Sequence, residues 1–192
     1  FNLGNAYFKQ NDIAHAILNF ERAYLLNPGD DDIAFNLELA RAYTTDKIEA
    51  IPDFFVVKWV KSISNLFSSN TWAFLAISSF IIALILFMIF QFSGKYLIKK
   101  YAFIISWFSA FIFIVSLAFS VSQKNRIVNS NHAIVTSSAV SVKSSPSESS
   151  NDLFILHAGT KVETLRNVGE WCEIRIADGN KGWLPRSAFE RI

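Results

Sequence analysis

The side chains of this sequence that most often carry chemistry are scattered along the chain. The three histidines, His15, His132 and His157, do not stand at metal-ligand spacing from one another or from cysteine or carboxylate residues. The acidic run Asp30–Asp32 lacks the alternation and the distal glutamate of a calcium loop, so we interpret it as a helix cap. The single cysteine, Cys172, lacks the basic or helix-terminal setting of a reactive thiol. We therefore expect no enzymatic activity, no metal site and no cofactor, and we expect function to lie in binding surfaces.

Two long uncharged runs, residues 62–94 and 101–123, dominate the middle of the chain. A helix that crosses a bilayer needs about 20 apolar residues, and a helix satisfies its own backbone polar groups in lipid. Hydrophobic residues make up 52% of the chain, above the roughly 45–50% usual for soluble domains. The sequence predicts transmembrane helices at 71–92 and 101–122, joined by a short basic loop at 93–100.

The lysines of the short loop bear on orientation. Lys95, Lys99 and Lys100 lie between the two runs, and positively charged loops stay in the cytoplasm. The flanks also carry Lys58, Lys61, Lys124 and Arg126, so the count of basic residues favours neither side strongly. Their density in the short loop favours a cytoplasmic turn, with both soluble ends outside the cytoplasm. The runs contain no charged residue or histidine that would mark an ion path, so a channel or transporter is not expected. No basic stripe of the kind that binds nucleic acid is present, and nucleic acid is not expected as a partner.

Residues 1–50 carry apolar side chains at helical spacing. Asn11 and Asp12 predict a break between two helices, and Asn27-Pro28-Gly29 predicts the end of the second. The spacing resembles a tetratricopeptide (TPR) repeat. The positions that carry this resemblance are Leu3, Gly4, Tyr7, Ala16, Phe20, Ala23 and Pro28. The helical spacing of the second helix is seen at Ala14, Ile17, Leu18 and Glu21.

A second TPR frame would begin at Asp31, but the sequence departs from the repeat pattern within it. Glu38 replaces the glycine of the pattern, and Pro52 falls where a second helix should run. Because a solenoid needs about three repeats, we expect at least one more upstream of Phe1. The residues that still fit this frame are Ile33, Asn36, Leu37, Ala40, Ala50 and Phe54.

The resemblance implies a groove along the first helices of the repeats, where TPR arrays bind a protein segment. Asn5 and Asn36 stand where carboxylate-binding TPRs place asparagine, whereas Phe1 and Phe35 replace lysine, which argues against a complete carboxylate clamp. The alternative is that these side chains pack against a neighbouring repeat. The implied groove residues are Asn2, Asn5, Phe8, Lys9, Phe35, Asn36, Leu39 and Tyr43.

The pattern of apolar and basic residues in 51–70 predicts an amphipathic helix next to the membrane, with Pro52 in its first turn. Lys58 and Lys61 fall on its polar face, so we expect it to lie in the headgroup plane; a helix that caps the solenoid is the alternative. Its apolar face comprises Val56, Trp59, Val60, Ile63, Leu66 and Phe67.

After a polar tether predicted at 123–138, residues 139–192 alternate with a period of two. Short runs separated by glycine turns at Gly159, Gly169 and Gly179 predict five strands of a small β-barrel. The motifs resemble a bacterial SH3-like domain. They are Ala139-Val140-x-Val142, Leu156-x-x-Gly159-x-x-Val162, Gly169-x-Trp171 and Asp178-Gly179-x-x-Gly182-Trp183-Leu184.

The SH3-like resemblance implies binding of cell-wall material or of protein segments. Trp171 and Trp183 are the candidate ligand-binding platform, and barrel core is the alternative for each of them. Cys172 should face the other side of the strand from Trp171 and serve a structural role.

The expected fold class is a multi-domain membrane protein with an all-α TPR solenoid, a transmembrane α-hairpin and a small all-β SH3-like barrel. This order of parts resembles the BatE-type proteins of the Bacteroides aerotolerance (Bat) operon. The resemblance implies a scaffold in the bacterial inner membrane with periplasmic soluble ends. Its implied partners are other Bat proteins with von Willebrand factor A domains, a MoxR-type ATPase, and peptidoglycan or a wall peptide. The alternative is the targeting half of a cell-wall enzyme whose catalytic part lies outside this chain.

Overall fold

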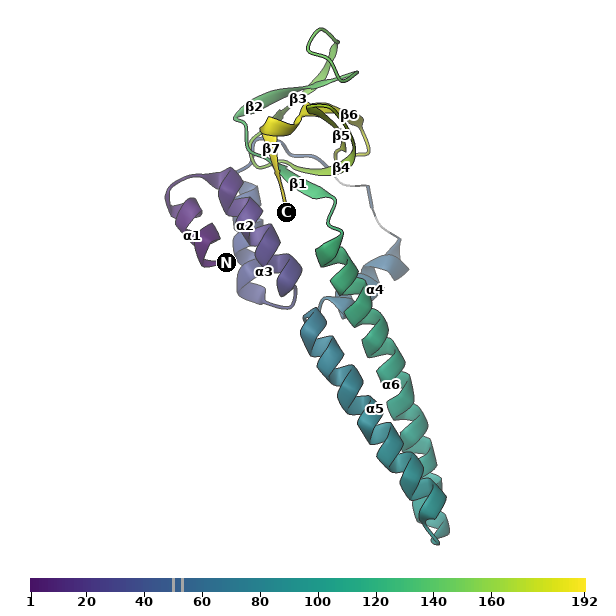
Figure 1. The fold of residues 1–192 in the computed structure, drawn as a ribbon. Helices are drawn as coiled ribbons and strands as arrows, with labels where there is room; N and C mark the ends of the chain where they lie inside the picture. The colour runs from purple at the N-terminus through teal and green to yellow at the C-terminus, as the bar shows by residue number, and fades with distance from the viewer. Residues whose placement is uncertain (50, 53) are drawn as a thin grey trace. The chain divides into compact units, whose positions relative to one another are not determined.

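A computed structural model describes residues 1–49, 51–52 and 54–192 (Figure 1). The chain forms two compact units, one that combines Phe1–Val60 with Asn129–Ile192 and one that comprises Lys61–Val128. The first unit is therefore built from two segments of the chain, and the second unit is inserted between them. The pattern position predicted at Ala50 lies outside the described residues.

The N-terminal part of the first unit is helical, and the predicted helix ends are confirmed. Asn11 adopts a left-handed conformation with φ 62°, and the Asp12 side chain accepts a hydrogen bond from the backbone N–H of His15. Asp30 caps the next helix by accepting from two backbone N–H groups of its first turn. The helices are α1 (Asn2–Lys9), α2 (Ile13–Leu26) and α3 (Asp31–Ala42).

Helices α1 and α2 approach closely at Gly4. A Cβ atom on Gly4 would lie 2.7 Å from the Phe20 ring, which only a residue without a side chain permits. Ala16 of α2 is fully buried in the same core. Gly4 therefore makes room for the Phe20 ring where α1 meets α2.

The C-terminal part of the first unit is an antiparallel sheet of seven strands among the described residues, in the order β3-β2-β6-β5-β4-β1-β7. Gly159, Gly169 and Gly179 adopt positive φ at three turns, as predicted. A short 3-10 helix, Arg186–Ala188, precedes the last strand. The strands are β1 (His132–Val135), β2 (Ala139–Lys143), β3 (Asp152–His157), β4 (Lys161–Val168), β5 (Trp171–Arg175), β6 (Lys181–Pro185) and β7 (Phe189–Arg191).

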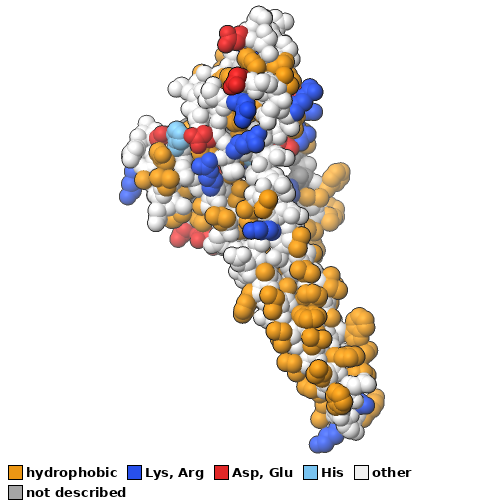
Figure 2. All heavy atoms as spheres, viewed as in Figure 1, with side chains coloured by type: hydrophobic (Ala, Val, Ile, Leu, Met, Phe, Trp, Pro, Cys, Tyr) orange, Lys and Arg blue, Asp and Glu red, His pale blue; other side chains and the backbone are white. Residues whose placement is uncertain are grey.

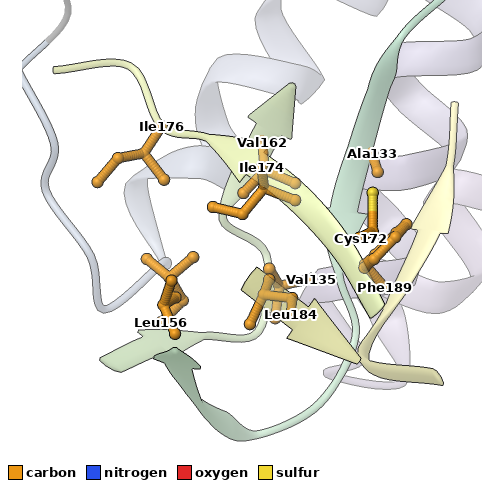
Figure 3. Close-up of a cluster of buried hydrophobic side chains, with 10 residues drawn as sticks. Ala133, Val135, Leu156, Val162, Cys172, Ile174, Ile176, Leu184 and Phe189 are labelled. Carbon is orange, nitrogen blue, oxygen red and sulfur yellow. The ribbon is translucent and has the colours of Figure 1, made fainter. Parts of the chain in front are cut away.

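The inward-facing side chains of this sheet form one apolar core, and Figure 3 shows them converging. Cys172 is fully buried in this core, as expected for a structural thiol, and burial raises its pKa. The other labelled members are Ala133, Val135, Leu156, Val162, Ile174, Ile176, Leu184 and Phe189.

The prediction of a tether at 123–138 is wrong. Helix α6 continues to Val128, and β1 occupies His132–Val135 within the sheet. Ala133 and Val135 point into the barrel core, while Ile134 packs with the helices, and all three are fully buried. Because both faces of β1 are buried, it lacks the apolar–polar alternation by which a strand is recognised.

The second unit is a pair of antiparallel helices, α5 (Ser69–Phe92) and α6 (Tyr96–Val128). Within the described part of the chain, these are the two helices that are long and apolar enough to cross a membrane. Hydrophobic side chains cover the face of this pair seen in Figure 2. The basic loop predicted at 93–100 is shorter than expected, since α6 begins at Tyr96.

Serine hydroxyls join α5 to α6. Ser69 and Ser120 each donate to the other's backbone carbonyl at 3.0 Å, and Ser109 donates to the Ser79 carbonyl at 2.8 Å. Small polar side chains allow close helix contact and find partners inside the pair. The Ser106 hydroxyl of α6 likewise donates to the Ala83 carbonyl of α5 at 3.0 Å.

Helix α4 (Phe55–Ser64) is shorter than the amphipathic helix predicted within 51–70. Phe55 is 82% exposed and Trp59 is 67% exposed, so its large apolar side chains face outward. In the second unit, the Ser64 carbonyl accepts from the Trp72 indole at 2.9 Å and from the Gln123 amide. The end of α4 is thereby fixed to the first turn of α5 and to α6.

We expect Ile134→Ala to destabilise the first unit by about 2–5 kcal/mol, because it removes a fully buried side chain and leaves a cavity. Ile155→Ala is the matched control: Ile155 lies on strand β3 and is 56% exposed, so we expect a change within about 0.5 kcal/mol. Chemical denaturation of both variants in detergent measures the difference. Equal stability of the two variants would contradict the burial of β1 on both faces.

Candidate functional site

The helices and the barrel of the first unit pack directly against each other. Ile134 of β1 and Ile192 join the apolar cluster of the helices. Gly159, with φ +91°, lies against α2 and the segment after α3: a Cβ atom there would lie 2.8 Å from Thr44 Cγ2 and 3.1 Å from Ile17 Cδ1. The Arg22 guanidinium donates to the Arg191 carbonyl at 2.6 Å. These contacts make the helices and the barrel one body.

A buried carboxylate lies within this contact. The Glu21 side chain is 3% exposed, and Lys161 Nζ of β4 lies 2.8 Å from its Oε2. Arg41 of α3 donates to the other oxygen, Oε1. Burial alone would raise the pKa of Glu21, but Lys161 and Arg41 outweigh it and hold the pKa below its ordinary value. Glu21 is therefore an ionised link between two helices and the barrel.

A second carboxylate, Asp46, links the segment after α3 to the barrel. Its Oδ2 accepts from the His157 backbone N–H and from the Thr160 hydroxyl, each at 2.7 Å. Its Oδ1 lies 2.7 Å from His157 Nδ1. Partial burial would raise the pKa of Asp46, but these hydrogen bonds outweigh it and lower the pKa.

The segment that follows α3, which we name the strap (residues 44–49 and 51), runs along the barrel. Lys47 Nζ donates to the Ala42 carbonyl at 2.8 Å, at the end of α3. Ile48 packs against the barrel core. The backbone N–H of Ile51 donates to the Ala177 carbonyl at 3.2 Å. Side-chain and main-chain contacts together hold the strap on the barrel.

Two open cavities border the strap. One, of about 580 Å³, lies between strap residues Asp46–Ile48, the β3 residues Leu153–Leu156 and Lys181. The other, of about 530 Å³, lies between Arg41, the strap and the residues Gly159–Lys161. Both cavities belong to the first unit, and a ligand could contact the strap and the barrel together in either of them.

The two candidate tryptophans lie on the outer face of neighbouring strands. Trp183 of β6 pairs with Glu173 of β5, so its side chain shares a face with Trp171 two residues away. The Arg166 guanidinium lies 5.1 Å from the centroid of the Trp183 ring and donates to Glu173 at 2.7 Å. Trp183 is 7% exposed beneath this cover, and Trp171 is half-buried. The barrel face therefore offers Trp171 more readily than Trp183.

Comparison with known families supports the assignment of the sheet. Residues 138–190 match the bacterial SH3 domain family. This part of the chain is a bacterial SH3 domain. The match begins after β1, so the strand that joins the SH3 domain to the helices lies outside it. No curated protein matches the chain.

The predicted groove residues of the helices lie partly together. The Phe8 and Tyr43 rings meet edge to face at 5.5 Å, and Phe35 and Tyr43 are exposed. The Asn36 amide donates to the Asp32 carbonyl at 2.7 Å, within its own helix. The binding role of the predicted groove residues stays a prediction. Of the others, Asn5 is half-buried, and Asn2, Lys9 and Leu39 are exposed.

Sequence reasoning did not find the contact between the helices and the SH3 domain. Its polar residues, Glu21 with Lys161 and Asp46 with His157, are separated by more than one hundred residues. One local signal existed: Glu21 falls at helical spacing with Ile17, on an otherwise apolar face. A carboxylate on such a face needs a cationic partner from another element.

We expect Glu21→Gln to destabilise the first unit by about 1–3 kcal/mol at pH 7, since a buried charged acceptor is lost. Glu163→Gln is the control: Glu163 pairs with Arg175 at the surface, and we expect a cost under about 1 kcal/mol.

The effect of Glu21→Gln should depend on pH. Because the pKa of Glu21 is lowered by folding, its stabilisation is complete above its unfolded pKa of about 4.5. It should disappear as pH falls through the lower folded pKa. Denaturation curves of wild type and variant should converge in acid, and a gap that widens there would contradict an ionised Glu21.

Proposed function

We propose that this protein is a non-enzymatic, membrane-anchored adaptor of the bacterial cell envelope. The observation that carries the proposal is the shared packing of the helices and the SH3 domain around β1. Two candidate binding faces, one on the helices and one on the SH3 domain, are thereby held on one body. The same chain carries two helices long enough to cross a membrane, which supply the anchor.

The make-up of the first unit supports a two-pass arrangement. Its segments Phe1–Val60 and Asn129–Ile192 precede and follow the helix pair. A body that buries side chains from both segments cannot be divided by a bilayer, which supports an even number of membrane crossings by the pair. Lys95 in the turn between α5 and α6, with Lys99 and Lys100 near the start of α6, favours a cytoplasmic turn and a periplasmic body.

The close contact at Gly4 supports the assignment of α1 and α2 to a TPR repeat, with α3 as the first helix of the next repeat. In this proposal the exposed face of α1 and α3 binds a protein partner. The order of helices, helix pair and SH3 domain supports the resemblance to BatE-type proteins. Other Bat proteins with von Willebrand factor A domains, and the MoxR-type ATPase complex, are the proposed partners.

For the SH3 domain we propose peptidoglycan or a wall peptide as ligand. Trp171 is the proposed contact, because it is the less covered of the two tryptophans on the outer face. An aromatic ring at a partly open position is a common anchor for ligands.

Asn5→Ala combined with Asn36→Ala should weaken co-purification of proteins with von Willebrand factor A domains from detergent-solubilised membranes. Loss of one important contact corresponds to about a tenfold loss of affinity. Asn19→Ala combined with Asn27→Ala is the matched control, because those asparagines lie on and just after α2, away from the predicted groove. Equal recovery with both double variants would contradict partner binding in the groove.

Trp171→Ala should reduce co-sedimentation of the protein with purified peptidoglycan. Trp59→Ala, which removes an exposed tryptophan of α4, should leave it unchanged. Sedimentation that does not depend on Trp171, or that is absent in wild type, would contradict the wall-binding face.

A further inference from the structure

The strap, whose described residues form neither helix nor strand, is bound to the surface of the SH3 domain, as a peptide ligand would be. Besides Thr44, which lies against Gly159, the contacts of its described residues with the domain include Asp46, Ile48 and Ile51. A carboxylate, a branched apolar side chain and a main-chain N–H are recognised in that order. Side-chain pockets combined with main-chain hydrogen bonds are the usual means by which a β-domain binds an extended peptide.

Among the described residues, the groups that donate to this carboxylate belong to the SH3 domain. The His157 N–H, the Thr160 hydroxyl and His157 Nδ1 surround Asp46 at 2.7 Å each. Because an ionised carboxylate only accepts hydrogen bonds, all three groups act as donors here. The Asp46 side chain is 13% exposed, so these donors form a partly shielded site that is specific for a carboxylate.

The apolar contact lies two residues further along the strap. Ile48 packs against the core of the SH3 domain, and Ile51 lies against Gly179, where a Cβ atom would be 3.2 Å from Ile51 Cδ1. The cavity of about 580 Å³ continues this surface along β3, where Leu153 and Ile155 are exposed. There is therefore room beside the strap for further residues of a ligand.

We propose that this surface is the peptide-binding site of the SH3 domain, that it accepts extended peptides with an acidic residue two positions before a branched aliphatic one, and that the strap is its resident ligand. The inference rests on the proposed binding role of the SH3 domain and names the ligand chemistry. The site is distinct from the face that carries Trp171, so the domain has two surfaces for two classes of ligand.

The test uses a labelled synthetic peptide with the sequence of residues 43–51, and fluorescence anisotropy with the full chain in detergent. The variant Asp46→Asn with Ile48→Ser should release the strap and bind the peptide. Wild type should bind it at least about tenfold more weakly, because the tethered strap competes at millimolar effective concentration. Glu49→Gln, which changes the next carboxylate of the strap, is the matched control and should behave as wild type.

Two further measurements assign the site. A peptide with asparagine at the position of Asp46 should not bind the released variant, and adding His157→Ala to that variant should abolish peptide binding. If the double variant unfolds, Asp46→Asn alone keeps Ile48 in place and should still bind the peptide more tightly than wild type does.

The proposal is overturned if a folded released variant does not bind the peptide, or if wild type binds it equally tightly. It is also overturned if binding survives His157→Ala. Co-sedimentation with purified peptidoglycan, for which Trp171 is the proposed contact, is measured on the same variants. Wall binding without peptide binding would refute this inference alone, whereas loss of both in folded protein would refute the binding role of the SH3 domain.

Discussion

Strand β1 is buried on both faces, and the organisation of the first unit depends on that double burial. Ala133 and Val135 complete the core of the SH3 domain, and the residue between them, Ile134, completes the core of the helices. A fully buried valine or isoleucine side chain, such as that of Val135 or Ile134, contributes roughly 1.5–3 kcal/mol. A strand with one exposed face would leave the SH3 domain free to move on a linker, whereas β1 joins it to the helices.

The polar contacts around β1 follow from the same constraint. Once the two parts are pressed together, Glu21 loses water and requires Lys161 and Arg41, and Asp46 requires the donors of His157 and Thr160. Glu21 thus ties α2 to the SH3 domain, and Asp46 ties the strap to it. The strap lies on the domain because its Asp46 and Ile48 satisfy a polar and an apolar site at once. The proposed peptide-binding surface of the SH3 domain is therefore the same surface that holds the strap in place.

Features that depend on neighbouring residues could be predicted from the sequence, whereas contacts between distant residues could not. Charge-free runs predicted α5 and α6, Asp12 and Asp30 predicted helix starts, and the motifs around Gly179 predicted the SH3 domain. Strand β1 was missed because a four-residue segment buried on both sides has no periodicity to detect. The partners of Glu21 and Asp46 were missed because pairing across more than one hundred residues is set by the packing of the whole unit.

We propose that the helices and the SH3 domain form one body on one side of a membrane, with the turn between α5 and α6 on the other side. In a background of Cys172→Ala, a single cysteine at Thr45, Ser145 or Lys95 can be labelled in intact cells with a membrane-impermeant maleimide. Thr45 and Ser145 are exposed positions of the first unit, and Lys95 lies between α5 and α6. We predict labelling at 45 and 145 and protection at 95. Labelling at only one of 45 and 145, with both accessible after the cells are lysed, would contradict the claim.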